Sequence, residues 1–266
     1  MLNWNPAQYL KFGGERTQVV RDLVHRLSDR LDSGRVRRIV DLGSGPGNST
    51  VVLAEAWPQA EVTGLDASPT MLEAARAAYP QLRFLAGDIP TWATTETAQY
   101  DLVFSNSTLQ WLPNHTELLP RLLERVAPGG ALGFQIPGNG AAAACRLPRE
   151  LAALPAWRDY FGPGKVTERW TGQMADFYDL LAPHAATVEV WETEYFMVVA
   201  GVEAIVEWYM GSGLPQYLAA LPDDAARAAF RLQYLEGLRA AYPVRRNGKV
   251  LFPFKRQFVI AQARGA

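Results

Sequence analysis

The sequence predicts an α/β protein built on a doubly wound, mostly parallel sheet of seven strands, with helical insertions after strands five and six. Two observations support this fold class. Short apolar segments alternate with helical segments through the first half of the chain, which is typical of a parallel sheet with crossover helices. Most of these apolar segments end at Asp, Asn or Gly, at the sheet edge where open α/β folds bind ligands.

Seven segments are expected to form the strands. Each is short, rich in apolar residues and bounded by polar or glycine-rich residues. In chain order they are 38–43, 61–66, 83–88, 101–106, 131–136, 188–196 and 255–262.

The helices are predicted from signals at their ends. Side chains at 48–50 could cap a helix over 51–57. Ser68 followed by Pro69 is a helix start that opens 70–79. Further helices are expected over 118–126, 202–210 and 223–241, with a turn at 128–130 leading into the fifth strand.

Composition limits the classes of function. The 266 residues are 48% hydrophobic and carry a formal net charge of −1, so no basic field exists to attract nucleic acid or an anionic membrane. A single cysteine excludes an intrachain disulfide and a cysteine-based zinc site, and three separated histidines argue against a histidine metal site. No signal-peptide pattern or membrane-length apolar run is present. We expect a cytoplasmic protein without metal, nucleic-acid partner or membrane anchor, with a monomer favoured.

The strongest chemical signal is the glycine-rich loop at 43–47, Gly-Ser-Gly-Pro-Gly, between the first strand and the first helix. Glycine lets backbone approach a ligand closely. A dinucleotide site would need glycine where Asn48 stands, and Pro46 removes an N–H that could bind a pyrophosphate. No Lys-Ser or Lys-Thr pair follows, which excludes a P-loop. The loop therefore predicts a nucleoside ligand without phosphates.

Acidic residues after neighbouring strands fit the same ligand. Asp66 ends the second predicted strand, where a carboxylate can accept both hydroxyls of a ribose. Asp88 ends the third and is placed to accept from the exocyclic amine of a purine, with Ile89 against the ring. Asp41 is expected to brace the glycine loop through backbone N–H groups. The segment 106–111 would border the other end of the ligand.

Together these motifs resemble the seven-stranded, Rossmann-like class I methyltransferases, which use S-adenosylmethionine. Each motif alone is also compatible with a tight turn or a helix start, but all occur in order between 38 and 136. The resemblance implies S-adenosylmethionine as cofactor, S-adenosylhomocysteine as its product, and a cofactor-binding half at 38–137. The cofactor-binding candidates are Asp41, Gly43, Ser44, Gly45, Asn48, Asp66, Ala67, Gly87, Asp88, Ile89, Asn106, Ser107 and Trp111.

A nearer resemblance, to the trans-aconitate 2-methyltransferase family, extends almost from end to end. It rests on segments 4–16, 109–115 and 247–258 and is weakest over 138–171. It implies methyl transfer to one carboxylate of trans-aconitate, or of a close small polycarboxylate, giving a monomethyl ester. An ionised carboxylate is already a nucleophile, so no catalytic base is expected. Since arginine pairs with carboxylates through two parallel hydrogen bonds, the substrate-binding candidates are Tyr9, Arg16, Trp111 and Arg256.

Alternatives remain at this point. Arg16 could hold the amino-acid carboxylate of the donor, and Tyr9 could belong to a lid or only attach the N-terminal segment to the core. Another small acid or a phenol could be the acceptor, and a phenol would require a general base, for which only His115 stands between 106 and 115. An NAD-dependent oxidoreductase is disfavoured by the glycine spacing, and a non-catalytic binding module by the complete set of motifs.

The domain organisation expected from the sequence is a single domain over 1–266. Within it we expect an N-terminal helical or lid segment at 1–30 and helical insertions at 138–186 and 200–245 that form a cap over the substrate.

Overall fold

The computed structural model describes residues 11, 13–167, 170 and 172–265. The chain divides into two compact units. The sheet unit comprises Gly13–Pro137, Arg169–Thr193 and Arg256–Ala266. The helical unit comprises Met1–Phe12, Gly138–Glu168 and Glu194–Lys255. The predicted roles of 1–30, 138–186 and 200–245 as lid and substrate cap stay predictions.

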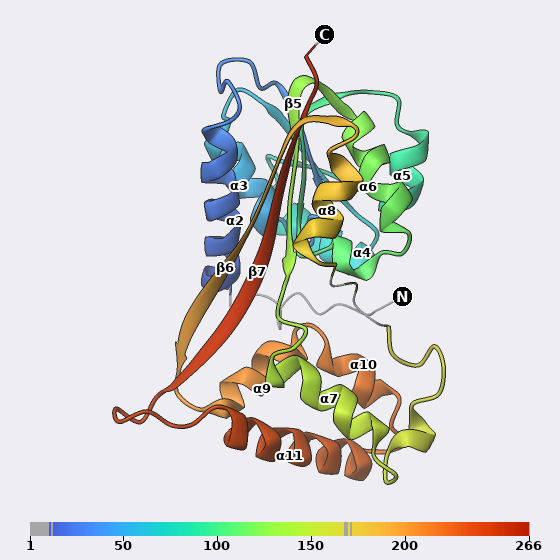
Figure 1. Cartoon of the computed structure of the whole chain (residues 1–266), viewed down its shortest axis with the longest axis vertical. Coiled ribbons are helices and arrows are strands. Elements are labelled where there is room, and N and C mark those ends of the chain that lie inside the picture. The colour runs from blue at the N-terminus through green and yellow to red at the C-terminus, as the bar shows by residue number, and fades with distance from the viewer. Residues whose placement is uncertain (1–10, 12, 168–169, 171, 266) are drawn as a thin grey trace. The chain divides into compact units, whose positions relative to one another are not determined.

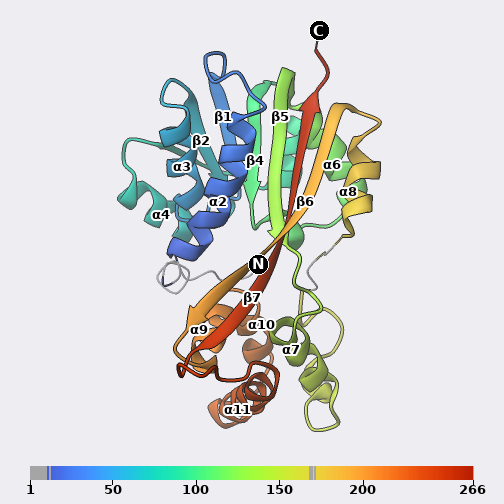
Figure 2. The same ribbon diagram turned by 60° about the vertical axis from the view of Figure 1, so that its left-hand side comes forward.

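The strands form one seven-stranded sheet with the order β3-β2-β1-β4-β5-β7-β6 (Figure 1), which confirms the predicted fold class. Strands β1 to β5 are parallel, and β7 runs antiparallel to β5, with β6 beside it at the edge (Figure 2). The strands are β1 (Arg38–Leu42), β2 (Glu61–Asp66), β3 (Arg83–Ala86), β4 (Tyr100–Asn106), β5 (Val126–Pro137), β6 (Ala185–Val199) and β7 (Val250–Ala263).

Helices cover both faces of the sheet within the sheet unit. Helices α2 (Gly13–Ser28) and α3 (Asn48–Ala56) lie on one face, and α5 (Ile89–Thr95), α6 (His115–Glu124) and α8 (Met174–Leu181) lie on the other (Figure 1). Because both faces are covered, the central strands are continuous apolar runs rather than alternating ones. The core between the sheet and α6 includes Val40, Leu42, Val103, Leu119, Leu132 and Phe134.

The start of α4 (Pro69–Ala78) confirms the prediction from Ser68 and Pro69. The Ser68 hydroxyl accepts a hydrogen bond from the Met71 N–H, and Pro69 is the first helical residue. The predicted caps at 48–50 are wrong. Gly47 is the N-cap of helix α3, and no side chain accepts a capping hydrogen bond there.

Other differences come from tertiary context. The predicted turn at 128–130 lies inside β5, whose register against β4 shifts between Tyr100 and Leu102. Helix α9 (Val202–Met210) has the predicted bounds, and α11 (Asp224–Ala241) begins one residue later because Asp223 is its N-cap. Helices α7 (Ala143–Ala153), η2 (Arg158–Tyr160) and α8 fall in the helical insertion predicted at 138–186, and α10 (Leu214–Ala219) in the one at 200–245, although their bounds were not predicted. Helices α5 and η1 (Leu109–Trp111) were not predicted.

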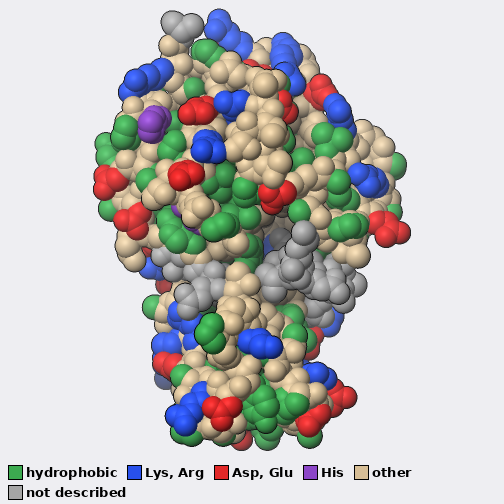
Figure 3. Space-filling view, turned by 90° about the vertical axis from the view of Figure 1, so that its right-hand side faces the viewer, with side chains coloured by type: hydrophobic (Ala, Val, Ile, Leu, Met, Phe, Trp, Pro, Cys, Tyr) green, Lys and Arg blue, Asp and Glu red, His purple; other side chains and the backbone are tan. Residues whose placement is uncertain are grey.

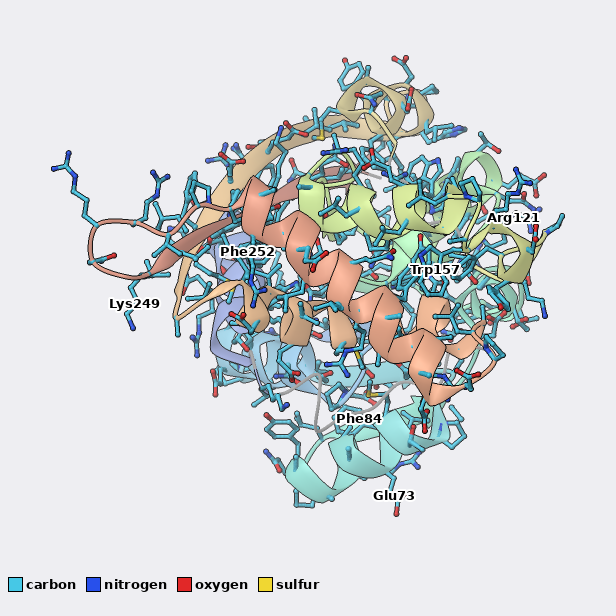
Figure 4. All side chains as sticks on the ribbon, turned by 90° about the horizontal axis from the view of Figure 1, so that it is seen from below. Glu73, Phe84, Arg121, Trp157, Lys249 and Phe252 are labelled. Carbon is cyan, nitrogen blue, oxygen red and sulfur yellow. The ribbon has the colours of Figure 1, made fainter. Side chains whose placement is uncertain are left out.

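The helical unit has a core of its own, rich in aromatic side chains. Trp157 packs edge-on against Phe230, with ring centroids 5.5 Å apart, and its Nε1 donates to Gln233 Oε1. Trp208 and Tyr209 of α9 are buried and contact Phe252, so they are core residues here. Figure 4 labels Phe252 and Trp157 in this unit.

The surface mixes both signs of charge. Acidic and basic side chains are interspersed over the face shown in Figure 3. In the described part of the chain, no helix is long and apolar enough to cross a membrane.

Candidate functional site

Three glycines of the loop after β1 adopt left-handed backbone conformations for different reasons. The φ angles of Gly43, Gly45 and Gly47 are +74°, +55° and +91°. A Cβ on Gly43 would lie 2.2 Å from Thr108 Cγ2, and one on Gly47 would lie 2.7 Å from Tyr79 Cδ2. A Cβ on Gly45 would meet no atom within 4 Å. Gly43 and Gly47 are therefore needed for packing, whereas Gly45 presents its backbone to open space, where a ligand can approach.

Asp66 links the glycine loop to the end of β2. Its Oδ2 accepts from the Gly45 N–H and its Oδ1 from the Ser68 N–H, both at 2.8 Å. Burial raises the pKa of Asp66, and these two hydrogen bonds oppose that rise. Each carboxylate oxygen has a second lone pair, so the group can still accept two ribose hydroxyls. The neighbouring Ala67 is exposed beside it.

Asp41 is fully buried beneath the loop. Its Oδ2 accepts from the hydroxyls of Ser49 and Thr50, both at 2.7 Å. Asp41 therefore holds the loop through two hydroxyls in the first turn of α3. The sequence had predicted that it would do so through backbone N–H groups. Burial raises the pKa of Asp41 to about 6; the two hydroxyls lower it, and the charge of Asp66 raises it further.

Three polar oxygens at this loop have no hydrogen-bond partner among the described residues. They are Asp41 Oδ1, Ser44 Oγ and Asn48 Oδ1, and each has almost no accessible surface. Buried oxygens normally accept or donate a hydrogen bond. Because these three atoms are closed off from the surface, the acceptor that a ligand can reach at this loop is the carboxylate of Asp66, beside the open backbone of Gly45.

Asp88 and Ile89 occupy the corresponding position after β3. Asp88 is the N-cap of α5, with its Oδ2 accepting from the Thr91 N–H and hydroxyl at 3.2 and 3.0 Å. Oδ1 lies outside these bonds, and Ile89 is buried at the first position of the helix. Gly87 has a packing role, since a Cβ there would lie 2.6 Å from Leu65 Cδ1.

A second group of polar side chains lies beyond β4 at the same edge of the sheet. Gln135 Nε2 donates to Asn106 Oδ1 and to Ser107 Oγ, and Arg256 Nη1 donates to Ser107 Oγ at 3.2 Å. Arg256 pairs with Pro137 at the carboxyl end of β5 and is only 6% exposed. The structure therefore brings together three candidates from distant parts of the sequence, namely Asn106, Ser107 and Arg256.

Gln135 was not predicted from the sequence. It is 1% exposed and lies near the carboxyl end of β5. The available signal was a single polar residue in the otherwise apolar run Ala131–Ile136, because a polar side chain in a buried strand needs a specific partner.

The remaining candidates are less closely tied to this edge. Trp111 ends η1 and is half-buried. Arg16 lies in the first turn of α2, also half-buried. Tyr9 lies outside the described residues. In the described ranges no cluster of His, Cys, Asp or Glu could hold a metal ion.

His115 is enclosed by its surroundings rather than exposed at the site. It is buried at the first position of α6, and its Nε2 lies 2.7 Å from the Leu109 carbonyl oxygen. A carbonyl only accepts, so this nitrogen carries the proton. The ring also stacks on Trp170, with centroids 3.7 Å apart, and burial lowers its pKa.

Comparison with known proteins identifies the family to which this chain is similar. A family model described as a methyltransferase domain matches residues 39–130. Trans-aconitate 2-methyltransferases from Paracidovorax citrulli and Methylobacterium radiotolerans are 43% and 46% identical to this chain, each over 98% of it and 99% of the relative. The one from Streptomyces coelicolor is 42% identical over 97% of this chain and 86% of its own length.

Solved structures agree on the fold. The YcgJ protein from Bacillus superposes with a TM-score of 0.58 at 11% identity, over 94% of this chain and 99% of that one. The phosphoethanolamine N-methyltransferase 2 of Haemonchus contortus gives 0.56 at 14% identity, over 94% and 53%. Since full-length relatives exceed 40% identity, the chain belongs to the trans-aconitate 2-methyltransferase family and is a class I methyltransferase.

Proposed function

We propose that this enzyme transfers the methyl group of S-adenosylmethionine to one carboxylate of trans-aconitate, giving a monomethyl ester and S-adenosylhomocysteine. One observation carries the proposal beyond the fold. A buried arginine, Arg256, lies at the same sheet edge as the glycine loop and Asp66, so a cation for an anionic acceptor accompanies the nucleoside site. The family's printed name supplies the particular acid.

The residues of the donor side fit S-adenosylmethionine, and we assign them as follows. Asp66 would accept the ribose hydroxyls, Asp88 the adenine amine, and Ile89 would contact the ring. The backbone of Gly45 leaves room for the nucleoside, and Asp41, Ser44 and Asn48 would shape the loop that surrounds it. When bound, the sulfonium group supplies an electrophilic methyl. Gly43, Ala67, Gly87 and Trp111 would complete the walls of this site.

The acceptor needs orientation rather than proton removal. Carboxylic acids are ionised at neutral pH, so an acceptor carboxylate needs no base. His115 is buried and its ring stacks on Trp170, so it offers no exposed base to a phenol, which disfavours a phenol as acceptor. Arg256 would hold a carboxylate through its planar fork of N–H donors. Holding the reacting oxygen in line with the methyl is the main source of rate in such a site.

The substrate class follows from the same chemistry. We propose a small polycarboxylate as the acceptor, with Arg16, Tyr9 and Trp111 as further contacts. We also propose that the enzyme acts in the cytoplasm as a monomer, without a nucleic-acid or membrane partner.

The direct test is a methyl-transfer assay with labelled S-adenosylmethionine. Trans-aconitate, cis-aconitate, citrate and isocitrate would be offered separately, and base-labile label would be scored as ester. We expect selective labelling of trans-aconitate. Label transfer to a phenol or amine but to none of the four acids would contradict the proposal.

A further inference from the structure

Ser107 is held in place from several directions. Its φ is +56°, a left-handed conformation that a residue with a Cβ rarely adopts unless its surroundings enforce it. Its N–H donates to the Gln135 carbonyl at 2.9 Å, and its own carbonyl accepts from Gln110 Nε2 at 2.7 Å. Gln110 and Gln135 are both buried, so the backbone of Ser107 is fixed by groups that cannot easily move.

The hydroxyl of Ser107 can still donate one hydrogen bond. A serine hydroxyl can accept two hydrogen bonds and donate one. Ser107 Oγ accepts from Gln135 Nε2 and from Arg256 Nη1, which uses both lone pairs. Over the described ranges, no residue accepts the proton of this hydroxyl. The Ser107 O–H is therefore oriented as a donor.

We infer that the Ser107 hydroxyl and the Arg256 guanidinium together bind one carboxylate of the acceptor, and that Gln135 is the residue that positions both. This inference rests on the proposed function. A cation and a neutral donor joined by a hydrogen bond suit a carboxylate, which has two acceptor oxygens and a negative charge. A carboxylate bound here keeps its charge, so it is one of those that remain unmethylated. Ser107 thus belongs to the acceptor site, whereas the sequence placed it among the cofactor contacts.

The arrangement also explains the polarity of Gln135. Its amide nitrogen reaches two acceptors, Asn106 Oδ1 and Ser107 Oγ, from one position. A residue with only acceptor oxygens there would turn the Ser107 proton toward itself and would also attract Arg256. The donor character of position 135 is what leaves the Ser107 proton for the substrate.

The test is Ser107→Gly in the full-length enzyme, with Ser107→Ala as its matched partner. Glycine accepts the left-handed backbone without strain, so it removes only the hydroxyl, whereas alanine removes the hydroxyl and keeps the strain. We expect both variants to lower kcat/KM for trans-aconitate about 10- to 100-fold, mainly through KM, as for a lost hydrogen bond to a charged group. The Kd for S-adenosylhomocysteine, measured by calorimetry, should stay within about twofold of wild type.

Two outcomes would overturn the inference while leaving the proposed function intact. A raised Kd for S-adenosylhomocysteine with an unchanged KM for trans-aconitate would place the hydroxyl in the cofactor site. Wild-type kinetics for Ser107→Gly with impaired Ser107→Ala would leave only a backbone role. If wild type itself esterifies no polycarboxylate, the proposed function fails first, before any variant is compared.

Gln135→Glu tests the positioning role separately. We expect a larger rise in the KM for trans-aconitate than Ser107→Gly gives, since glutamate both captures the hydroxyl proton and pairs with Arg256. The Kd for S-adenosylhomocysteine should change less than this KM does, although the hydrogen bond from Gln135 to Asn106, a cofactor-binding candidate, is also lost. A fall in kcat alone, with the KM for trans-aconitate as in wild type, would contradict a positioning role and indicate a general structural one.

Discussion

The donor side and the acceptor side of the site are built by different means. The donor side uses backbone conformation, with three left-handed glycines and a carboxylate, Asp66, that binds the loop through the Gly45 N–H. The acceptor side uses side chains from separate parts of the chain, namely the half-buried Ser107 just after β4, and the buried Gln135 of β5 and Arg256 of β7. The first depends on a local stretch of sequence. The second exists only after β4, β5 and β7 have come together.

This difference decides how much could be predicted. A glycine loop, an aspartate at the end of the next strand and a Ser-Pro helix start are local signals. The sequence therefore predicted that the loop and Asp66 bind one ligand and that Ser68 starts a helix. Ser107 and Arg256 are 149 residues apart, and no local pattern indicates their hydrogen bond. The sequence nominated both residues, but in separate sites, and it did not identify Gln135, which joins them.

The fold shows the same division. Strand positions followed from apolar runs, and seven strands were predicted and observed. The turn expected at 128–130 lies within the bounds of β5, but the register with β4 passes from Val126 directly to Ala131, so the chain is irregular where the turn was predicted. The capping side chains expected at 48–50 instead include two that donate to Asp41, a partner on another element.

The largest effect is expected from substituting a glycine of the donor side, which tests whether this side depends on backbone conformation. Gly43→Ala combines a left-handed φ with a clash against Thr108, and we expect a loss of about 2–6 kcal/mol in the free energy of unfolding. Gly129→Ala is the matched control, because φ is +78° there but a Cβ would meet no atom within 4 Å, and about 1–2 kcal/mol is expected. Urea unfolding measures both, and equal losses would show that the clash with Thr108 is relieved.

The next largest effect is expected in the pH dependence of stability that Asp41, the buried carboxylate beneath the loop, produces. The folded-state pKa of Asp41 is raised from 3.8 to about 6, so the folded protein binds a proton that the unfolded chain releases at those pH values. The contribution of Asp41 to stability is greatest below pH 4, is lost as pH rises to 6, and amounts to about 3 kcal/mol.

Asp41→Asn should remove this dependence. The variant's unfolding free energy relative to wild type should rise by about 3 kcal/mol between pH 4 and pH 7. Denaturant unfolding of both proteins across that range gives the comparison. A constant difference would mean that Asp41 titrates normally in the folded state.

A crossed pair of variants tests the separation of the two sides directly. Arg256→Met should raise the KM for trans-aconitate about 10- to 100-fold and leave the Kd for S-adenosylhomocysteine unchanged, because it removes a charged partner of the acid. Asp66→Asn should do the reverse, since its amide would face one of the two N–H groups that the carboxylate now accepts. If both variants change both constants equally, the two sides form one site.

The smallest effect is expected from removing the N-cap of α4 on the donor side. Ser68→Ala removes the cap of α4, whose hydrogen bond to the Met71 N–H is 3.4 Å long, and should cost about 0.5–1 kcal/mol of stability. Ser68→Asp, which restores a capping oxygen, is the control. A large rise in the Kd for S-adenosylhomocysteine with Ser68→Ala alone would show that this cap also orients Asp66.

The antiparallel pairing of β7 with β5 makes the acceptor side sensitive to chain length. Side chains alternate between the faces of a strand, so a shift of β7 by one residue would exchange Arg256 with Gln257 opposite the end of β5. With the start of β7 held in place, a one-residue deletion between Val250 and Arg256 would put Gln257 opposite Pro137, and an insertion would put Lys255 there, so the buried guanidinium is lost in either case. The same change in the turn before β7, where Lys249 lies (Figure 4), can be absorbed outside the ladder. Natural length variation should therefore be tolerated in that turn and selected against a few residues later.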